Sequence, residues 1–94
     1  MIILVVNCGS SSLKYQLLDM KNDEVYDLLA KGIVERIGME TGCLKHQATD
    51  KEKLVKEMPI ENHTVAIKAV MDALLDKEYG VLSTLEDIEA VGLA

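Results

Sequence analysis

Residues 2–18 of the chain read IILVVNCGSSSLKYQLL, and their pattern predicts the first structural unit of the fold. Ile2–Val6 is a continuous apolar run rich in β-branched residues, which predicts a strand buried on both faces of a sheet. The small residues of Asn7–Ser12 predict a turn. Leu13–Leu18 then begins with alternating apolar and polar side chains, which predicts a second strand. The first structural unit is therefore expected to be strand–turn–strand.

Four further strands are predicted along the rest of the chain. Val25–Ile37 is predicted as a strand, with a helix as the alternative because its apolar spacing is imperfect. Cys43–Thr49 and Lys53–Met58 predict two short polar strands, with a hairpin turn at Asp50 between them. Ile88–Val91 is short and apolar and predicts a last buried strand.

One helix is predicted over His63–Tyr79. Asn62 can cap its start, and Gly80 can supply a left-handed cap at its end. The apolar residues at helical spacing form one stripe, which we interpret as a core face and not as a ligand site: Ile67, Val70, Met71, Leu74 and Leu75.

Length and charge limit the possible functions. The 94 residues allow one domain, and 16 acidic against 10 basic residues give a net charge of −6. A nucleic-acid partner is not expected, because such proteins need a basic field and usually aromatic stacking platforms, and this chain has only three aromatic residues. The charge is uneven, since residues 1–18 contain one lysine and no acid. Such a segment could host an anion, or it could simply be a buried pair of strands.

The cysteines and the hydropathy of the sequence indicate the cellular compartment of the protein. Ile2–Val6 is too short for a secretory signal, and no apolar run is long enough to span a membrane. We therefore expect a cytoplasmic protein with reduced thiols and no membrane partner. Cys43 and His46 have a zinc-like spacing, but a site would need Cys8 and His63 to converge on them. Metal binding through these residues is not expected.

The residues that indicate a function form the pattern Asn7-x-Gly9-Ser10-x-Ser12-x-Lys14. A tight turn exposes backbone N–H groups, and Gly9 permits a close approach to the backbone. The hydroxyls of Ser10 and Ser12 donate further hydrogen bonds, and Lys14 adds a positive charge. Asn7 offers an amide oxygen to a magnesium ion or to its water shell. The set suits a polyphosphate, while a solvated serine-rich turn remains the alternative from spacing alone.

Two better-known motifs fit this turn poorly. It is not a Walker A loop, because no second glycine precedes Lys14 and a strand is predicted where a helix should follow. Residues 11–14 match the S-x-x-K pattern of penicillin-binding proteins and class A β-lactamases, in which Ser11 would be acylated. That motif should open a helix, and its partner motifs S-D-N and K-T-G are absent. Acyl transfer is therefore disfavoured.

Residues 3–17 match the opening signature of a known family, and the match continues at residues 35–38, 62–63, 78–81 and 88–92. In these segments the sequence resembles acetate kinases of the acetate/propionate kinase family. The resemblance covers essentially the whole chain. It implies an α/β fold, namely the leading βββαβ part of a ribonuclease H-like domain. That domain belongs to the superfamily of acetate and sugar kinases, actin and heat-shock ATPases.

The resemblance also implies a reaction and a set of site residues. The family reversibly transfers the γ-phosphoryl group of ATP, with Mg²⁺, to acetate, giving ADP and acetyl phosphate. By this resemblance Asn7 would face the metal and the phosphates, and Ser10, Ser12 and Lys14 would contact the phosphates of ATP. No catalytic residue is assigned within the chain.

The end of the chain departs from the family pattern. Leu93-Ala94 stands where the family continues with a His-Arg pair whose arginine contacts the carboxylate substrate. Residues 1–94 are therefore expected to be an incomplete N-terminal portion of the first kinase domain, with the second domain absent. The parent protein is expected to be a homodimer and the isolated chain to be inactive. The alternative is a non-catalytic structural or assembly module made from a truncated chain.

Overall fold

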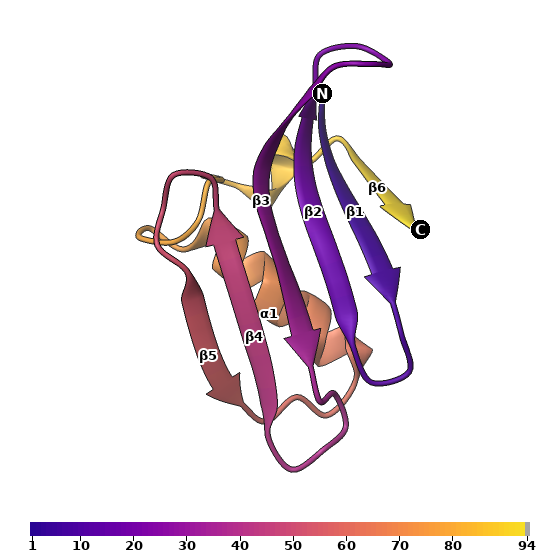
Figure 1. Ribbon diagram of the computed structural model, residues 1–94, viewed down its shortest axis with the longest axis vertical. Coiled ribbons are helices and arrows are strands. Elements are labelled where there is room, and N and C mark those ends of the chain that lie inside the picture. The colour runs from indigo at the N-terminus through magenta and orange to yellow at the C-terminus, as the bar shows by residue number, and fades with distance from the viewer. Residues whose placement is uncertain (94) are drawn as a thin grey trace.

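A single sheet with one helix packed on one of its faces makes up the computed structural model, which describes residues 1–93 (Figure 1). Ala94, part of the departure from the family pattern, lies outside the described residues. The elements in chain order are β1 (Ile2–Cys8), β2 (Leu13–Met20), β3 (Tyr26–Glu35), β4 (Gly42–Ala48), β5 (Leu54–Met58), α1 (His63–Leu75), the 3-10 helix η1 (Leu85–Asp87) and β6 (Ala90–Leu93).

The strand order in the sheet is β5-β4-β3-β2-β1-β6. The first five strands form antiparallel pairs in sequence order, whereas β6 returns to the far side of β1 and runs parallel to it. The predicted strand over Val25–Ile37 is confirmed as β3, so the helical alternative is wrong. Asp50 adopts a φ of +63°, in the turn predicted between β4 and β5. The expected βββαβ order is present, with β4 and β5 inserted before α1.

Within residues 1–93, only one face of the sheet is covered by a helix. Leu4 and Val6 of β1 point into the core beneath α1 and are buried, but Ile3 and Val5, which alternate with them, are half-buried on the other face. The prediction that Ile2–Val6 is buried on both faces is therefore wrong in this structure. The physical reason is that α1 is the one long helix of residues 1–93, and a single helix covers a single face.

The helix begins where predicted and ends four residues earlier. Asn62 caps it, its side-chain oxygen accepting a hydrogen bond from the Val65 amide at 2.9 Å. At the other end the carboxylate of Asp76 accepts hydrogen bonds from the amides of Glu78 and Tyr79, at 2.8 and 2.9 Å. This local side-chain turn replaces the helical hydrogen bonds, so the helix stops at Leu75.

The role predicted for Gly80 is also wrong, because its backbone does not adopt a positive φ. Gly80 instead lets the chain pass close to the end of α1, where an added Cβ would collide with the carbonyl oxygens of Leu74 and Asp76. Leu74 is the last turn's main acceptor, since its carbonyl oxygen receives hydrogen bonds from the amides of Val81 and Leu82, each at 3.0 Å.

The buried face of α1 is rotated from the predicted stripe. Val70 and Leu74 are buried as predicted, but Ile67 is 40% exposed and Met71 and Leu75 are only partly buried. Alanines complete the buried face instead and allow the helix to lie close to the sheet: Ala66, Ala69 and Ala73.

The last strand is shifted by two residues from the predicted Ile88–Val91. Thr84 caps η1, and the Ile88 amide still bonds to the carbonyl of Leu85, so the chain becomes extended only beyond this turn. Val91 is 59% exposed and not buried, because within the described residues β6 is an edge strand. Among residues 1–93, no helix combines the length and apolar character needed to cross a membrane.

Candidate functional site

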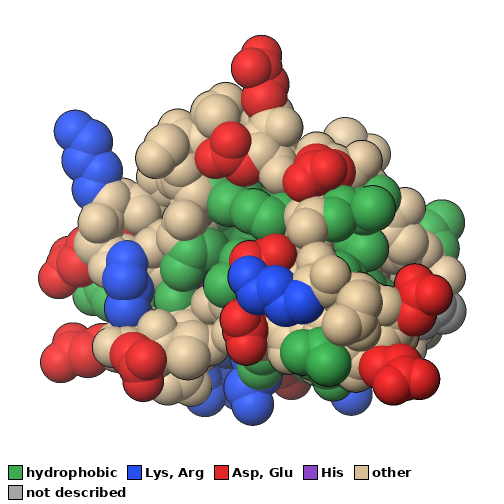
Figure 2. Space-filling model, turned by 90° about the horizontal axis from the view of Figure 1, so that it is seen from above, with side chains coloured by type: hydrophobic (Ala, Val, Ile, Leu, Met, Phe, Trp, Pro, Cys, Tyr) green, Lys and Arg blue, Asp and Glu red, His purple; other side chains and the backbone are tan. Residues whose placement is uncertain are grey.

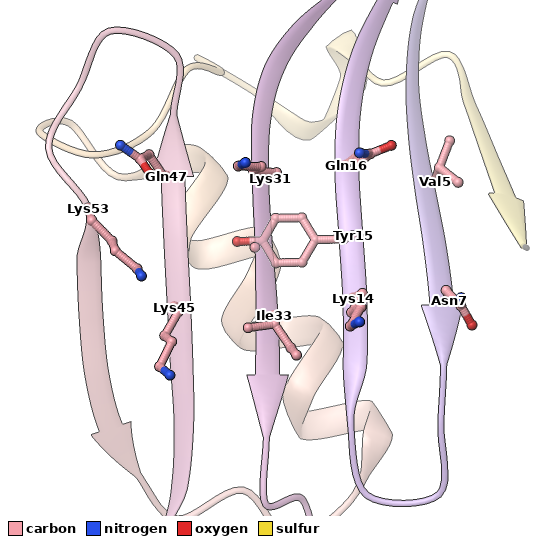
Figure 3. Close-up of a pocket in the computed structure, with 11 residues that line it drawn as sticks. Val5, Asn7, Lys14, Tyr15, Gln16, Lys31, Ile33, Lys45, Gln47 and Lys53 are labelled. Atoms are coloured by element: carbon pink, nitrogen blue, oxygen red, sulfur yellow. The ribbon is translucent and has the colours of Figure 1, made fainter.

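The β1–β2 hairpin carries the predicted site residues. Cys8 pairs with Leu13 at its end, and the four residues Gly9–Ser12 form the loop, which we call the first loop. Asn7 and Lys14 are direct cross-strand partners in this hairpin, so both side chains lie on the same face of the sheet. Figure 3 shows both of them at the loop end of the hairpin, on the side away from α1.

The polar side chains at the first loop have no partners inside the described chain. Asn7, Ser10 and Lys14 are exposed and Ser12 is partly exposed. None of the hydrogen bonds or ion pairs found among residues 1–93 involves the side chain of any of the four. The loop backbone is nevertheless tight, since the Gly9 amide donates to the Ser12 carbonyl at 2.8 Å. These side chains are therefore free to bind a ligand.

A hollow of about 590 Å³ adjoins this end of the hairpin, on the face of the sheet that α1 leaves open (Figure 3). Asn7 and Lys14 line it together with three further lysines: Lys31, Lys45 and Lys53. Among residues 1–93, no carboxylate lines it. In a chain of net charge −6, a wall of lysines without carboxylates creates a local positive potential that attracts anions.

The three additional lysines were not among the site residues predicted from the sequence. The strand register explains how they gather: Lys14 lies opposite Ile33, and Ile33 lies opposite Lys45 in the next strand. Lys45 also forms an ion pair with Glu35 at 3.0 Å, and this hydrogen bond raises the pKa of Lys45. Alternation along β3 and β4 was the signal that would have placed these lysines on one face.

The end of the molecule opposite the first loop carries exposed acidic side chains. It carries the β2–β3 turn, where Asp23 and Glu24 are exposed. Figure 2 looks onto this end and shows carboxylates spread over it, with lysine or arginine side chains and hydrophobic side chains between them. An anionic ligand is therefore favoured at the first loop over this end.

His46 has a structural role instead of the metal role considered for it. Its Nε2 atom donates to the Tyr79 carbonyl at 3.1 Å, so its Nδ1 atom must accept from the Tyr15 hydroxyl. Both side chains are buried, and burial lowers the pKa of His46 and raises that of Tyr15. The structure does not bring the predicted zinc-spaced residues together, since Cys8 is exposed on β1 and Cys43 is buried on β4. No cluster of three His, Cys, Asp or Glu residues suited to a metal occurs within residues 1–93.

The acyl-transfer alternative also lacks its structural setting. Ser11 lies in the first loop and Lys14 lies on β2, so the helix that an S-x-x-K motif should open is a strand here.

The comparison with protein families identifies the family of this chain. The sequence model of the acetokinase family matches residues 2–93. The chain belongs to the acetokinase family. Among curated acetokinase relatives, the acetate kinase of Alkaliphilus metalliredigens is 54% identical over 90 residues, and that of Carboxydothermus hydrogenoformans is 56% identical over 90 residues. Each match covers 96% of this chain and 22% of the relative, so the chain spans about a fifth of their length.

Solved structures of this family share the fold. The crystal structure of Porphyromonas gingivalis acetate kinase matches with a TM-score of 0.89 at 41% identity, covering 98% of this chain and 22% of that one. A propionate kinase from Francisella tularensis matches with a TM-score of 0.76 at 29% identity, covering 98% and 21%. The sheet and helix described above are therefore the N-terminal part of the actin-like ATPase fold found in acetate and propionate kinases.

Proposed function

We propose that this chain supplies the phosphate-binding hairpin of an acetate kinase, which transfers the γ-phosphoryl group of ATP to acetate and forms acetyl phosphate and ADP. The observation that carries the proposal is the unpartnered polar set on the β1–β2 hairpin, beside a lysine-lined hollow in an otherwise acidic chain. Membership of the acetokinase family supports the same conclusion.

Each residue of the set has a distinct role in this proposal. Lys14 neutralises charge on the phosphates, and Ser10 and Ser12 donate hydrogen bonds to their oxygens. Phosphoryl transfer depends mainly on such positioning and charge neutralisation, because the moving group spreads its negative charge over three oxygens. The first loop therefore acts on the donor nucleotide. The acceptor carboxylate and the catalytic acid or base belong to other parts of the intact protein.

Mg²⁺ fits this site only as an ion that arrives with the nucleotide. Asn7 offers one neutral amide oxygen, and its side chain is exposed and unpartnered. Mg²⁺ commonly takes one or two protein ligands and completes its shell with phosphates and water. Asn7 would thus face the hydrated ion, and the ion would supply further neutralisation of the phosphate charge.

Acetate is the acceptor in this proposal because curated relatives of the chain are acetate kinases. The chain has higher identity and a higher TM-score against the acetate kinase than against the propionate kinase. We further propose that the intact protein is a cytoplasmic homodimer, and that residues 1–94 are the first portion of its first domain. The isolated chain is expected to be inactive, because transfer requires the donor and the acceptor halves of the site together.

The test is Lys14→Ala in the intact protein that contains this chain. We expect the rate of acetyl phosphate formation at limiting MgATP to fall by about a hundredfold or more. Lys68→Ala is the matched control, because Lys68 is an exposed lysine on α1, across the sheet from the site. Normal rates in Lys14→Ala would remove Lys14 from the site. Acetyl phosphate made by the purified 94-residue chain would contradict its expected inactivity.

A non-catalytic assembly module is the second candidate. Its support is the edge strand β6, where Val91 is 59% and Leu93 82% exposed, because exposed apolar edges pair with other chains. Light scattering on the 94-residue chain tests it: a dimer or larger species supports the module, and a clean monomer argues against it.

A further inference from the structure

A residue far away in the sequence forms a hydrogen bond with the backbone of the first loop. His63 is the first residue of α1, and its Nε2 atom lies 2.8 Å from the carbonyl oxygen of Gly9, 54 positions away along the chain. A carbonyl oxygen only accepts, so the ring donates the hydrogen bond. The Asn62 cap sets the start of α1 and thereby the position of this donor.

A second tie acts on the same loop. The amide of Ile37 donates to the carbonyl of Ser11 at 2.9 Å. Residues outside the loop thus donate hydrogen bonds to two of its carbonyls. The side chain of His63 donates to that of Gly9, and the backbone amide of Ile37 donates to that of Ser11.

These ties determine which way the loop amides point. In a trans peptide the C=O of one residue and the N–H of the next point in opposite directions. Because the Gly9 carbonyl points at His63, the Ser10 amide points away from it. The Ser12 amide likewise points away from Ile37. Neither amide donates to a backbone carbonyl in any turn or loop of residues 1–93.

We propose that His63 is a positioning residue that orients the Gly9–Ser10 peptide, so that the Ser10 amide donates to a nucleotide phosphate. This inference rests on the proposed function of the first loop. Backbone amides that converge from a turn bind anions well, and a pair fixed beforehand binds without a further ordering cost. His63 acts through the loop and does not itself touch the phosphate.

The experiment compares His63→Leu with His63→Gln in the intact protein. The Gln side chain can place an N–H near the position of the ring Nε2, whereas Leu cannot donate. The readouts are the dissociation constant of MgADP, measured by calorimetry, and the melting temperature. We expect His63→Leu to weaken MgADP binding about tenfold and His63→Gln to remain within about threefold of the wild type.

Thr64→Ala is the control, since Thr64 is an exposed neighbour in the same helical turn. It should bind MgADP as the wild type does. If His63→Leu does not fold, His63→Asn replaces it, because the shorter amide keeps polarity but falls short of Gly9. Wild-type binding by the non-donating variant overturns the inference. Equal loss in His63→Leu and His63→Gln also overturns it, because the donor would then not be what matters.

Lys14→Ala, measured beside these variants, distinguishes a failure of the positioning role of His63 from a failure of the proposed phosphate site. Weakened MgADP binding in Lys14→Ala together with normal binding in His63→Leu overturns the positioning role alone. Normal binding in Lys14→Ala overturns the proposed phosphate site and the positioning role with it.

Discussion

Lys14 and Tyr15 are neighbours in β2, yet they belong to two opposite kinds of polar region. Tyr15 points beneath α1, where its hydroxyl and both ring nitrogens of His46 are satisfied by hydrogen bonds inside the protein. Lys14 points to the open face, where it and the first loop have polar groups without partners. Buried polar groups with hydrogen-bond partners therefore stabilise this fold, whereas exposed polar groups without partners in residues 1–93 remain available to a ligand.

The largest effect is expected at Gly32, which lies between the two buried partners in the sheet. An added Cβ would collide with the Tyr15 hydroxyl and with the backbone carbonyl of Lys45. Gly32→Ala should therefore lower the free energy of unfolding by about 3 kcal/mol, measured by urea denaturation. Gly92→Ala is the control, because a Cβ there meets no atom within 4 Å. Equal stability of the two variants would show that the buried region is not tightly packed.

A smaller loss is expected from Tyr15→Phe. The ring volume is preserved, but the Nδ1 atom of His46 is left buried without its donor. The expected cost is about 2 kcal/mol in the free energy of unfolding. Tyr26→Phe serves as the control, since Tyr26 is 55% exposed and its hydroxyl makes no hydrogen bond within residues 1–93. A Tyr15→Phe protein as stable as the control would show that the hydrogen bond between Tyr15 and His46 does not stabilise the fold.

The burial of His46 should also make the free energy of unfolding depend on pH. Burial lowers the pKa of His46 in the folded state below its ordinary value near 6.5. The unfolded chain therefore takes up a proton first, so stability is full above about pH 6.5 and falls as the pH drops below it. The limiting slope is about 1.4 kcal/mol per pH unit. Asp76, the charged group near the ring, raises the pKa only as a minor cause.

His46→Gln should abolish the loss between pH 7 and 5, even if it lowers stability overall. The carboxylates with lowered pKa values, among them Asp19 and Glu35, contribute at lower pH, because their protonation begins nearer pH 4. Denaturation curves at half-unit pH steps measure the slope. An unchanged slope in the variant would assign the pH dependence to another group.

The smallest effect on stability is expected at the first loop. Lys14→Ala and Ser10→Ala remove exposed groups without partners, so the free energy of unfolding should change by less than about 0.5 kcal/mol. The same variants are expected to impair nucleotide handling. A loss above 1.5 kcal/mol, roughly the cost of a broken buried contact, would erase the distinction between the two regions.

The parts of the fold that depend on local pattern were predictable from the sequence. Alternation identified β2, and the cap at Asn62 identified the start of α1. The end of α1 was missed because the Asp76 carboxylate competes with the helix for backbone amides, which helix periodicity does not reveal. Burial of Ile2–Val6 was overestimated because it depends on which segments cover each face.

The candidate site divides in the same way. A hairpin centred on the first loop already implies that Asn7 and Lys14 are cross-strand partners, so that pairing follows from the sequence. The hydrogen bond from His63 to Gly9 joins residues with no local signal linking them, and only the packing of α1 against the sheet brings them together. The hollow likewise required the register of β3 and β4.

The parallel pairing of β1 with β6 has a consequence for folding during synthesis. Ile3 pairs with Ala90, so one side of β1 stays open during synthesis until β6 has been made. At a synthesis rate of 5 to 20 residues per second, the roughly 70 residues between β2 and β6 take about 4 to 14 s. During that interval the nascent chain presents an apolar edge strand, a natural target for chaperones and a hazard for aggregation. The strand that carries Asn7 of the candidate site is therefore also a member of the last pair of strands to form.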